Sequence, residues 1–222
     1  MNLLAIDTST EIASVALMAG DEMTCEEQLG QKLQAQLLVP LIHQIMTQSG
    51  LGLNQLDGIV FGCGPGSFTG LRIACSIAKG LAYAHDLNLI PISSLGAIAY
   101  AVRQQEAYSQ SPVLALLDAR MQEVYWGYYP PDTLLAVDRV DAVQDIHLPN
   151  QQPLICAGVG IEPYWDAIPA ALKGQITSTI PCYPNAAVMI RLAVAAAIKP
   201  VSAAYAQPLY VRNQVTQGAS RG

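Results

Sequence analysis

The chain has 222 residues and a mass of 23.6 kDa, which is enough for one large domain or two small lobes with a well-packed core. Hydrophobic residues make up 52% of the sequence and charged residues only 13%, which excludes an intrinsically disordered chain. The net charge of −6 does not suit the body of the protein to a phosphate backbone. However, residues 1–71 carry seven acids and one base, whereas residues 167–222 carry five bases and no acid. Only the C-terminal end is therefore a candidate for contact with RNA.

The sequence shows no targeting, membrane or metal-binding pattern. The longest apolar stretch, Ala186 to Ile198, is interrupted by Arg191 and is shorter than the roughly 18 to 20 residues of a membrane span. The N-terminal MNLLAIDTSTE lacks a basic region and a cleavage site, so we expect no signal peptide and a cytoplasmic protein. The five cysteines form no CxxC pair and the three histidines no HExxH motif, so we expect reduced thiols and no metal site.

The first half of the chain predicts a mixed sheet flanked by helices. Three strands joined by tight turns, at residues 3–7, 12–18 and 22–29, form an antiparallel meander. A helix over about residues 33–48 follows, with a kink at Pro40, and ends at Gly50. The remaining elements are a strand at 58–63, a helix at about 71–85, a strand at 88–92 and a helix through 103 that is capped by Ser93 or Ser94. The order is βββαβαβα.

The second half repeats the start of the first. A shift of 111 residues places Leu3–Leu17 on Leu114–Tyr128 and Asp7 on Asp118, each aspartate following an apolar strand and preceding a polar turn. Chance is the alternative, since such strand ends are common. The half continues with strands at 134–138 and 154–157, a turn at 158–160, a short helix at 162–170 and a helix at 186–198 capped by Asn185.

This pattern predicts one lobe that has been duplicated. We expect an N-terminal lobe at residues 1–105 with partner-binding helices, a C-terminal lobe at 106–200, and a partly flexible C-terminal segment at 201–222. A ligand would then bind in the cleft between the lobes.

The turn formed by Asp7, Thr8, Ser9 and Thr10 has two interpretations. Its backbone N–H groups and hydroxyls can wrap a phosphate, while Asp7 and its equivalent Asp118 hold a metal ion through water. Alternatively, these residue types favour turns because they bond their own backbone. The sequence leaves both interpretations open.

The segment GCGPGSFTGLR, Gly62 to Arg72, places four glycines and a proline between a buried strand and a helix. Such a loop can cradle an anion, because glycine permits close backbone approach and the helix N-terminus offers free N–H groups. It matches neither a Walker A loop, nor GxGxxG, nor GxSxG. The alternative is structural, with Ser67 or Thr69 capping the helix. The candidate residues are Gly64, Gly66, Ser67, Thr69 and Gly70.

The turn after Asp118 weakens a phosphotransferase interpretation. A phosphate-wrapping hairpin needs small residues, but Arg120, Met121 and Gln122 fill this one. Arg120 can pair with a phosphate, with Glu123 or with a partner's carboxylate. No lysine or histidine pattern suggests a base or a nucleophile.

Together these motifs carry a family resemblance. IDTST, GPGSFTGLRIA, PISSL, DARxxEVY and PLYVR resemble the TsaB (YeaZ) family of tRNA threonylcarbamoyladenosine biosynthesis proteins over nearly the whole chain, although IDTST is shared with the wider actin and sugar-kinase-like superfamily. The resemblance implies an α/β fold with two ribonuclease-H-like lobes (the actin/hexokinase-like, or ASKHA, fold) and duplicated mixed βββαβα sheets.

The resemblance also implies a function. It implies a subunit without catalytic residues, in which Asp7, Thr8, Ser9, Thr10, Asp118 and Arg120 are vestigial nucleotide or phosphate loops. Such a subunit pairs with the catalytic paralogue TsaD and the ATPase TsaE to place threonylcarbamoyl on the adenosine beside the anticodon. A homodimer is the alternative to the pair with TsaD. The resemblance further implies that tRNA is contacted indirectly, that no membrane is involved, and that the subunit has no cofactor of its own. ATP or ADP can bind at the interface of the complex. The alternative is an ATP-dependent kinase-like phosphotransferase that holds magnesium with Asp7 and Asp118.

The chain departs from many relatives in two places, with Gln34 where they have a histidine and with Met121 and Gln122 where they have basic and glycine residues.

The predicted partner interface lies on the helices at 33–48 and 71–85, whose apolar faces are wide. The alternative is that the protein's own core fills these faces. We expect Leu41→Asp or Ile73→Asp to abolish pairing without unfolding the monomer. The predicted interface residues are Leu37, Leu38, Leu41, Ile45, Arg72, Ile73 and Ile77.

Overall fold

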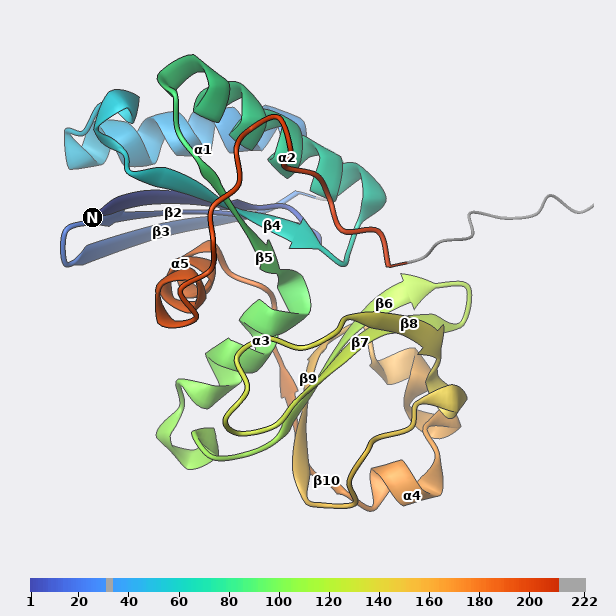
Figure 1. Ribbon diagram of the computed structural model, residues 1–222. Coiled ribbons are helices and arrows are strands. Elements are labelled where there is room, and N and C mark those ends of the chain that lie inside the picture. Colours follow the sequence, from blue (N-terminus) through green and yellow to red (C-terminus); the bar gives the residue numbers. More distant parts are fainter. Residues whose placement is uncertain (31–33, 212–222) are drawn as a thin grey trace, which may run out of the picture.

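The computed structural model describes residues 1–30 and 34–211, which form two five-stranded mixed sheets (Figure 1). The first sheet has the order β3-β2-β1-β4-β5 and the second the order β10-β9-β6-β7-β8. The strands of the first sheet are β1 (Asn2–Asp7), β2 (Ile12–Ala19), β3 (Glu22–Leu29), β4 (Gly58–Gly64) and β5 (Leu89–Ser93). Those of the second are β6 (Val113–Arg120), β7 (Glu123–Tyr129), β8 (Arg139–Ala142), β9 (Leu154–Val159) and β10 (Ile176–Pro181).

The two sheets have the same topology. In the first sheet the central strand β1 pairs antiparallel with β2 and parallel with β4. In the second sheet the central strand β6 pairs antiparallel with β7 and parallel with β9. Asp7 ends β1 opposite Ser14, and Asp118 lies at the same level of β6 opposite Val124. This repeat confirms the predicted two-lobed, ASKHA-like α/β fold.

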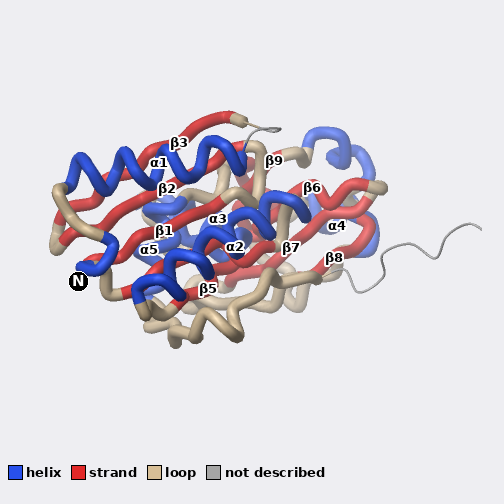
Figure 2. The backbone as a smooth tube through the Cα atoms, turned by 90° about the horizontal axis from the view of Figure 1, so that it is seen from above, coloured by secondary structure: helices blue, strands red, loops and turns tan. Residues whose placement is uncertain are grey.

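Five α-helices lie on the sheets within the described residues. Helices α1 (Gln34–Ser49) and α2 (Phe68–His85) cover the outer face of the first sheet (Figure 2). Helices α3 (Ser94–Arg103) and α5 (Ala186–Ala195) lie between the sheets and contact each other. Helix α4 (Ala170–Lys173) packs on the outer face of the second sheet with 3₁₀ segments at Val143–Asp145 and Glu162–Ala167. Further 3₁₀ segments lie at Leu53–Gln55 and Glu106–Tyr108.

The two middle helices are exchanged between the sheets. Helix α3 follows β5 of the first sheet but packs mainly on β6, β7 and β9 of the second. Helix α5 follows β10 of the second sheet but packs on β1, β2 and β4 of the first. The lobe boundaries at 105/106 and 200/201 stay predictions. The structure adds that α3, from the N-terminal segment, packs on the second sheet and that α5, from the C-terminal segment, packs on the first.

The helix caps were predicted correctly from the sequence, whereas several helices and strands of the second half were not. Ser67, Ser93 and Asn185 cap α2, α3 and α5, as predicted. The predicted strand at 134–138 is wrong, because the buried Arg103 guanidinium binds the carbonyls of the preceding loop and the strand begins only at residue 139. The carbonyls bound by Arg103 are those of Tyr129, Pro130 and Thr133.

Two further elements differ from the predictions. The helix predicted at 162–170 is a 3₁₀ segment followed by the short α4. Strand β10 was missed, because an edge strand with the half-exposed sequence ITSTIP carries no apolar run. No helix in residues 1–30 and 34–211 is long and apolar enough to span a bilayer. The five cysteines are free thiols in the structure.

The predicted interface is wrong for three residues of α1. Leu38, Leu41 and Ile45 are 0%, 8% and 1% exposed, because they fill the core between α1 and the first sheet. Leu41→Asp should therefore unfold the lobe rather than only abolish pairing. The other predicted interface residues stay predictions, with Leu37, Ile73 and Ile77 half-buried and Arg72 exposed.

Candidate functional site

A cleft of about 680 Å³ opens between the two lobes. Its first-lobe wall is formed by Ser9, Thr10 and Glu11 of the β1–β2 turn and by Gly66 to Thr69 of the Gly-rich loop. Its second-lobe wall is formed by the ends of β6 and β9, with Asp118, Arg120 and Gly160. The structure thus brings most of the predicted loop residues together, but Asp7 and Thr8 do not line the cleft.

Asp7 is enclosed in the first lobe. Its side chain is 0% exposed, and its Oδ2 accepts hydrogen bonds from the backbone N–H of Ser9 at 3.2 Å and from Ser9 Oγ at 2.9 Å. Its Oδ1 is buried and has no hydrogen-bond partner among the described residues. A Cβ at Gly62 would lie 1.8 Å from this oxygen, so glycine provides the space that the carboxyl group occupies. Burial raises the pKa of Asp7 to about 7.

The neighbouring hydroxyls are also used within the lobe. Thr8 Oγ1 donates to the carbonyl of Gly70 at 2.7 Å, and the N–H of Ser67 donates to the carbonyl of Ser9 at 2.7 Å. A Cβ at Gly66 would lie 2.3 Å from that same carbonyl oxygen. The Gly-rich loop therefore packs directly on the turn, and Thr8 and Ser9 offer no free hydroxyl to a phosphate.

The Gly-rich loop itself is held from two sides. Ser67 Oγ accepts from the N–H of Gly70 at 3.3 Å and so caps α2, whereas Thr69 is exposed and lines the cleft. On the other side, the N–H of Leu209 donates to the carbonyl of Cys63 at 2.7 Å. Gly64 has a φ of +114°, a backbone conformation that favours glycine.

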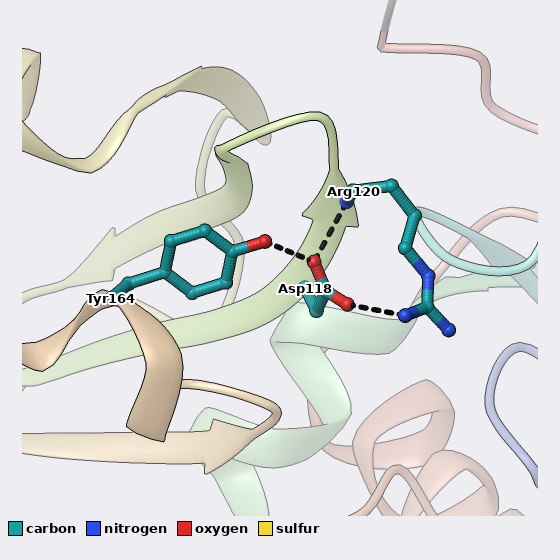
Figure 3. A network of polar contacts seen from close by, with 3 residues as sticks. All are labelled: Asp118, Arg120 and Tyr164. Carbon is teal, nitrogen blue, oxygen red and sulfur yellow. Dashed lines mark hydrogen bonds and ion pairs between the residues drawn. The ribbon is translucent and has the colours of Figure 1, made fainter.

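On the second-lobe wall, Asp118 is engaged by neighbouring side chains (Figure 3). Its Oδ1 accepts from Tyr164 Oη at 2.6 Å and from the N–H of Arg120 at 2.7 Å, and its Oδ2 lies 3.1 Å from the Arg120 guanidinium. The hydrogen bond to Asp118 raises the pKa of Tyr164 to about 12. The Arg120 side chain is 86% exposed, so its ion pair orients Asp118 but adds at most about 1 kcal/mol to stability.

Sequence reasoning missed two residues that shape this cleft. Tyr164 comes from a 3₁₀ segment 46 residues after Asp118, and Tyr183 Oη donates to Glu11 Oε1 at 2.6 Å across 172 residues. Gly160, which belongs to the predicted turn at 158–160, has a φ of +72° and lets the end of β9 approach Asp118. No spacing in the sequence signals these contacts. Within residues 1–30 and 34–211, no three His, Cys, Asp or Glu side chains cluster closely enough to hold a metal ion.

Comparison with known proteins assigns the family. The sequence profile described as TsaD, tRNA N6-adenosine threonylcarbamoyltransferase, matches residues 28–202. The chain is 36% identical to the tRNA threonylcarbamoyladenosine biosynthesis protein TsaB of Haemophilus influenzae, over 97% of this chain and 95% of that protein. This chain belongs to the TsaB (YeaZ) family.

Other members of the TsaB family agree in sequence and fold. The TsaB protein of Escherichia coli is 34% identical, with 97% of this chain and 96% of that protein covered. The solved structure of YeaZ from Pseudomonas aeruginosa superposes with a TM-score of 0.85 at 31% identity, covering 94% of this chain and 99% of that one.

This TsaB-family chain has an unusual hairpin where it departs from the family pattern. Arg120, Met121 and Gln122 have φ values of +63°, +54° and +65°. Because Arg120 pairs with Glu123, Met121 and Gln122 form a two-residue turn with both φ values positive, a geometry usually occupied by Asn-Gly. The side chains here therefore strain the backbone. The other departure, Gln34, has a side chain outside the described residues.

We expect Gln122→Gly to stabilise the protein by about 0.5–1 kcal/mol, because glycine adopts a positive φ without strain. Urea denaturation measures the change. Gln44→Gly, in the exposed face of α1, is the matched control and should destabilise by about 1 kcal/mol. A loss of stability in both variants would contradict the assigned strain.

Proposed function

We propose that this chain is a non-catalytic subunit of the complex that makes N6-threonylcarbamoyladenosine next to the anticodon of tRNA, and that it scaffolds and activates a TsaD-like catalytic paralogue. The names of its relatives place those proteins in this biosynthesis. The main support for a subunit without catalytic activity is Asp7, which is buried: its carboxyl group faces the interior of the lobe and not the cleft.

The chemistry of the cleft supports this proposal over a phosphotransferase. Phosphoryl transfer needs carboxylates that hold Mg²⁺ through water and donors that wrap the phosphates. Here Asp7 is buried, Asp118 is paired with Arg120, and Glu11 accepts a hydrogen bond from Tyr183. The hydroxyls of Thr8 and Ser9 are bonded inside the lobe.

The outer face of α1 and the side of α2 that carries Ile73 and Ile77 are the proposed docking surface for the catalytic paralogue or, alternatively, for a second copy of this chain. A TsaE-like ATPase completes the complex that modifies the tRNA, and ATP or ADP binds at the interface of the complex and not in this chain alone. We place the complex in the cytoplasm. The exposed part of this surface includes Val39, which is 55% exposed on α1.

Val39→Asp should weaken association with a TsaD-like partner roughly tenfold or more, the effect of about 1.4 kcal/mol, by placing a charge in an apolar contact. Leu135→Asp is the matched control, because Leu135 is also 55% exposed but lies in the second lobe. Surface plasmon resonance measures affinity, and mass spectrometry of tRNA nucleosides measures the modification with and without this subunit.

The proposal requires modified adenosine to form only when both proteins are present. Calorimetry with ATP and magnesium on the isolated chain tests the alternative directly. Micromolar ATP binding with turnover by this chain alone would instead establish a phosphotransferase.

A further inference from the structure

After α5 the chain returns along α2 as an irregular segment with a turn at residues 203–205; this segment, residues 199–211, is here called the C-terminal strap (Figure 1). It pairs with β5 through Val201 and Leu89, and farther along, the carbonyl of Ala206 accepts from Lys79 Nζ at 3.0 Å. Tyr210 Oη then accepts from Arg72 Nε at 3.0 Å. The strap thus passes from the C-terminal end of α2 to its N-terminal end, and the two segments form one continuous surface.

This α2–strap surface carries every Phe, Tyr or Trp side chain that is exposed in the described residues. Phe68 and Tyr83 of α2 are 52% and 87% exposed, and Tyr205 and Tyr210 of the strap are 82% and 43% exposed. A single exposed aromatic residue needs no explanation, but the gathering of all four on one strip indicates a binding surface.

A cation lies between two of these rings. The Arg72 guanidinium lies 3.7 Å from the centre of the Phe68 ring and 5.9 Å from that of Tyr210, and the two rings are 5.7 Å apart. Arg72 is exposed and forms no ion pair with any residue in the described part of the chain. The stack therefore holds a positive charge and flat aromatic rings at the protein surface.

The charge of this surface is opposite to that of the protein. Residues 68–85 and 199–211 contain Arg72, Lys79 and Lys199 and no acid, in a chain of net charge −6, and the exposed Asp86 follows directly as the C-cap of α2. The sequence beyond the strap continues with Arg212 and Arg221, again without an acid. A surface with three cations along it and one acid at its end attracts an anionic ligand.

We infer that the α2–strap surface binds an unpaired segment of RNA, whose bases stack on the exposed aromatic rings while Arg72 and the nearby lysines contact phosphates. Exposed aromatic rings interleaved with cations are the features by which proteins bind single-stranded nucleic acid without a sequence code. The identity of the RNA as a tRNA loop rests on the proposed function. The binding itself rests only on this surface.

The test is fluorescence anisotropy of the full chain with a labelled anticodon stem–loop RNA at several salt concentrations. Tyr83→Ala and Tyr205→Ala should each weaken binding about fivefold or more, which is the lower range for one base–aromatic stack. Arg72→Gln should weaken binding and lower the slope of log affinity against log salt by about one. Ultraviolet crosslinking with peptide mapping should place the RNA on residues of α2 and the strap.

Two controls separate RNA binding from general charge and folding effects. Arg139 of β8 is also exposed and also stacks on an aromatic ring, that of Trp126, but it lies outside the α2–strap surface. Arg139→Gln should therefore leave the affinity for RNA unchanged. Tyr205→Phe keeps the ring and should bind as the wild type does. Thermal melting verifies that each variant is folded.

The outcomes distinguish this inference from the proposed function. Absence of RNA binding at low salt, or equal losses in Arg72→Gln and Arg139→Gln, would overturn the RNA surface while leaving the partner role intact. If the strip variants keep RNA affinity but lose association with the TsaD-like partner, the surface is a protein interface and the inference is wrong.

Discussion

Asp7→Asn is expected to remove a large part of the pH dependence of stability. The native carboxyl group keeps its proton up to a pH of about 7, whereas in the unfolded chain it loses it near the ordinary value of 3.8. Between these pH values the native state binds more protons, so the stability contributed by this group is full below about pH 4 and is lost as the pH rises through 7. Three pKa units correspond to roughly 4 kcal/mol, an upper value for the effect.

The measurement is the free energy of unfolding in urea between pH 4 and pH 8. The amide introduced by Asp7→Asn cannot ionise, so the stability of this variant should fall much less over this range. Some dependence should remain, because burial also raises the pKa of Asp138 to about 6. Asp21→Asn, at an exposed turn position, is the control and should leave the pH profile unchanged. An Asp7→Asn profile that matches the wild type would contradict the buried, protonated carboxyl group.

The same variant separates the two functional hypotheses. A non-catalytic subunit needs no carboxylate at position 7, so tRNA modification by the reconstituted complex should persist with Asp7→Asn. A phosphotransferase that holds magnesium through Asp7 would lose its activity.

Gly158→Ala is expected to prevent folding or to cost more than about 4 kcal/mol, a range reached only by a few mechanisms such as backbone clashes. Gly158 of β9 lies opposite Leu116 of β6, and a Cβ there would lie 1.7 Å from the Leu116 carbonyl oxygen. Its φ of +141° is also a conformation that side chains rarely adopt. The two central strands of the second sheet would therefore have to separate beside the cleft.

Gly80→Ala is the matched control within α2. A Cβ at Gly80 meets no atom within 4 Å, so alanine should stabilise the helix by about 0.5–1 kcal/mol. Expression yield and urea denaturation compare the two variants. Wild-type stability in Gly158→Ala would show that β6 and β9 do not approach as closely as the structure has them.

The first lobe could be predicted closely because its signals are local. Apolar alternation, tight turns and side-chain caps act over a few residues, so β1 to β5 and the start of α3 at Ser93 emerged near their observed bounds. The second half has weaker signals. The edge strand β10 is half-exposed and has no apolar run, and the course of residues 129–138 depends on Arg103, which reaches it from another element.

For the candidate site, the sequence determined that Asp7 and Asp118 occupy equivalent strand ends and that a Gly-rich loop lies close by. Only the tertiary structure decided that Asp7 is enclosed, that Tyr164 and Arg120 engage Asp118, and that Tyr183 closes on Glu11. The physical reason is that the direction and solvation of a polar side chain depend on whichever distant elements pack around it. Tyr183, for example, lies just before α5, which packs on the first sheet, and this exchange of helices leaves no local pattern in the sequence.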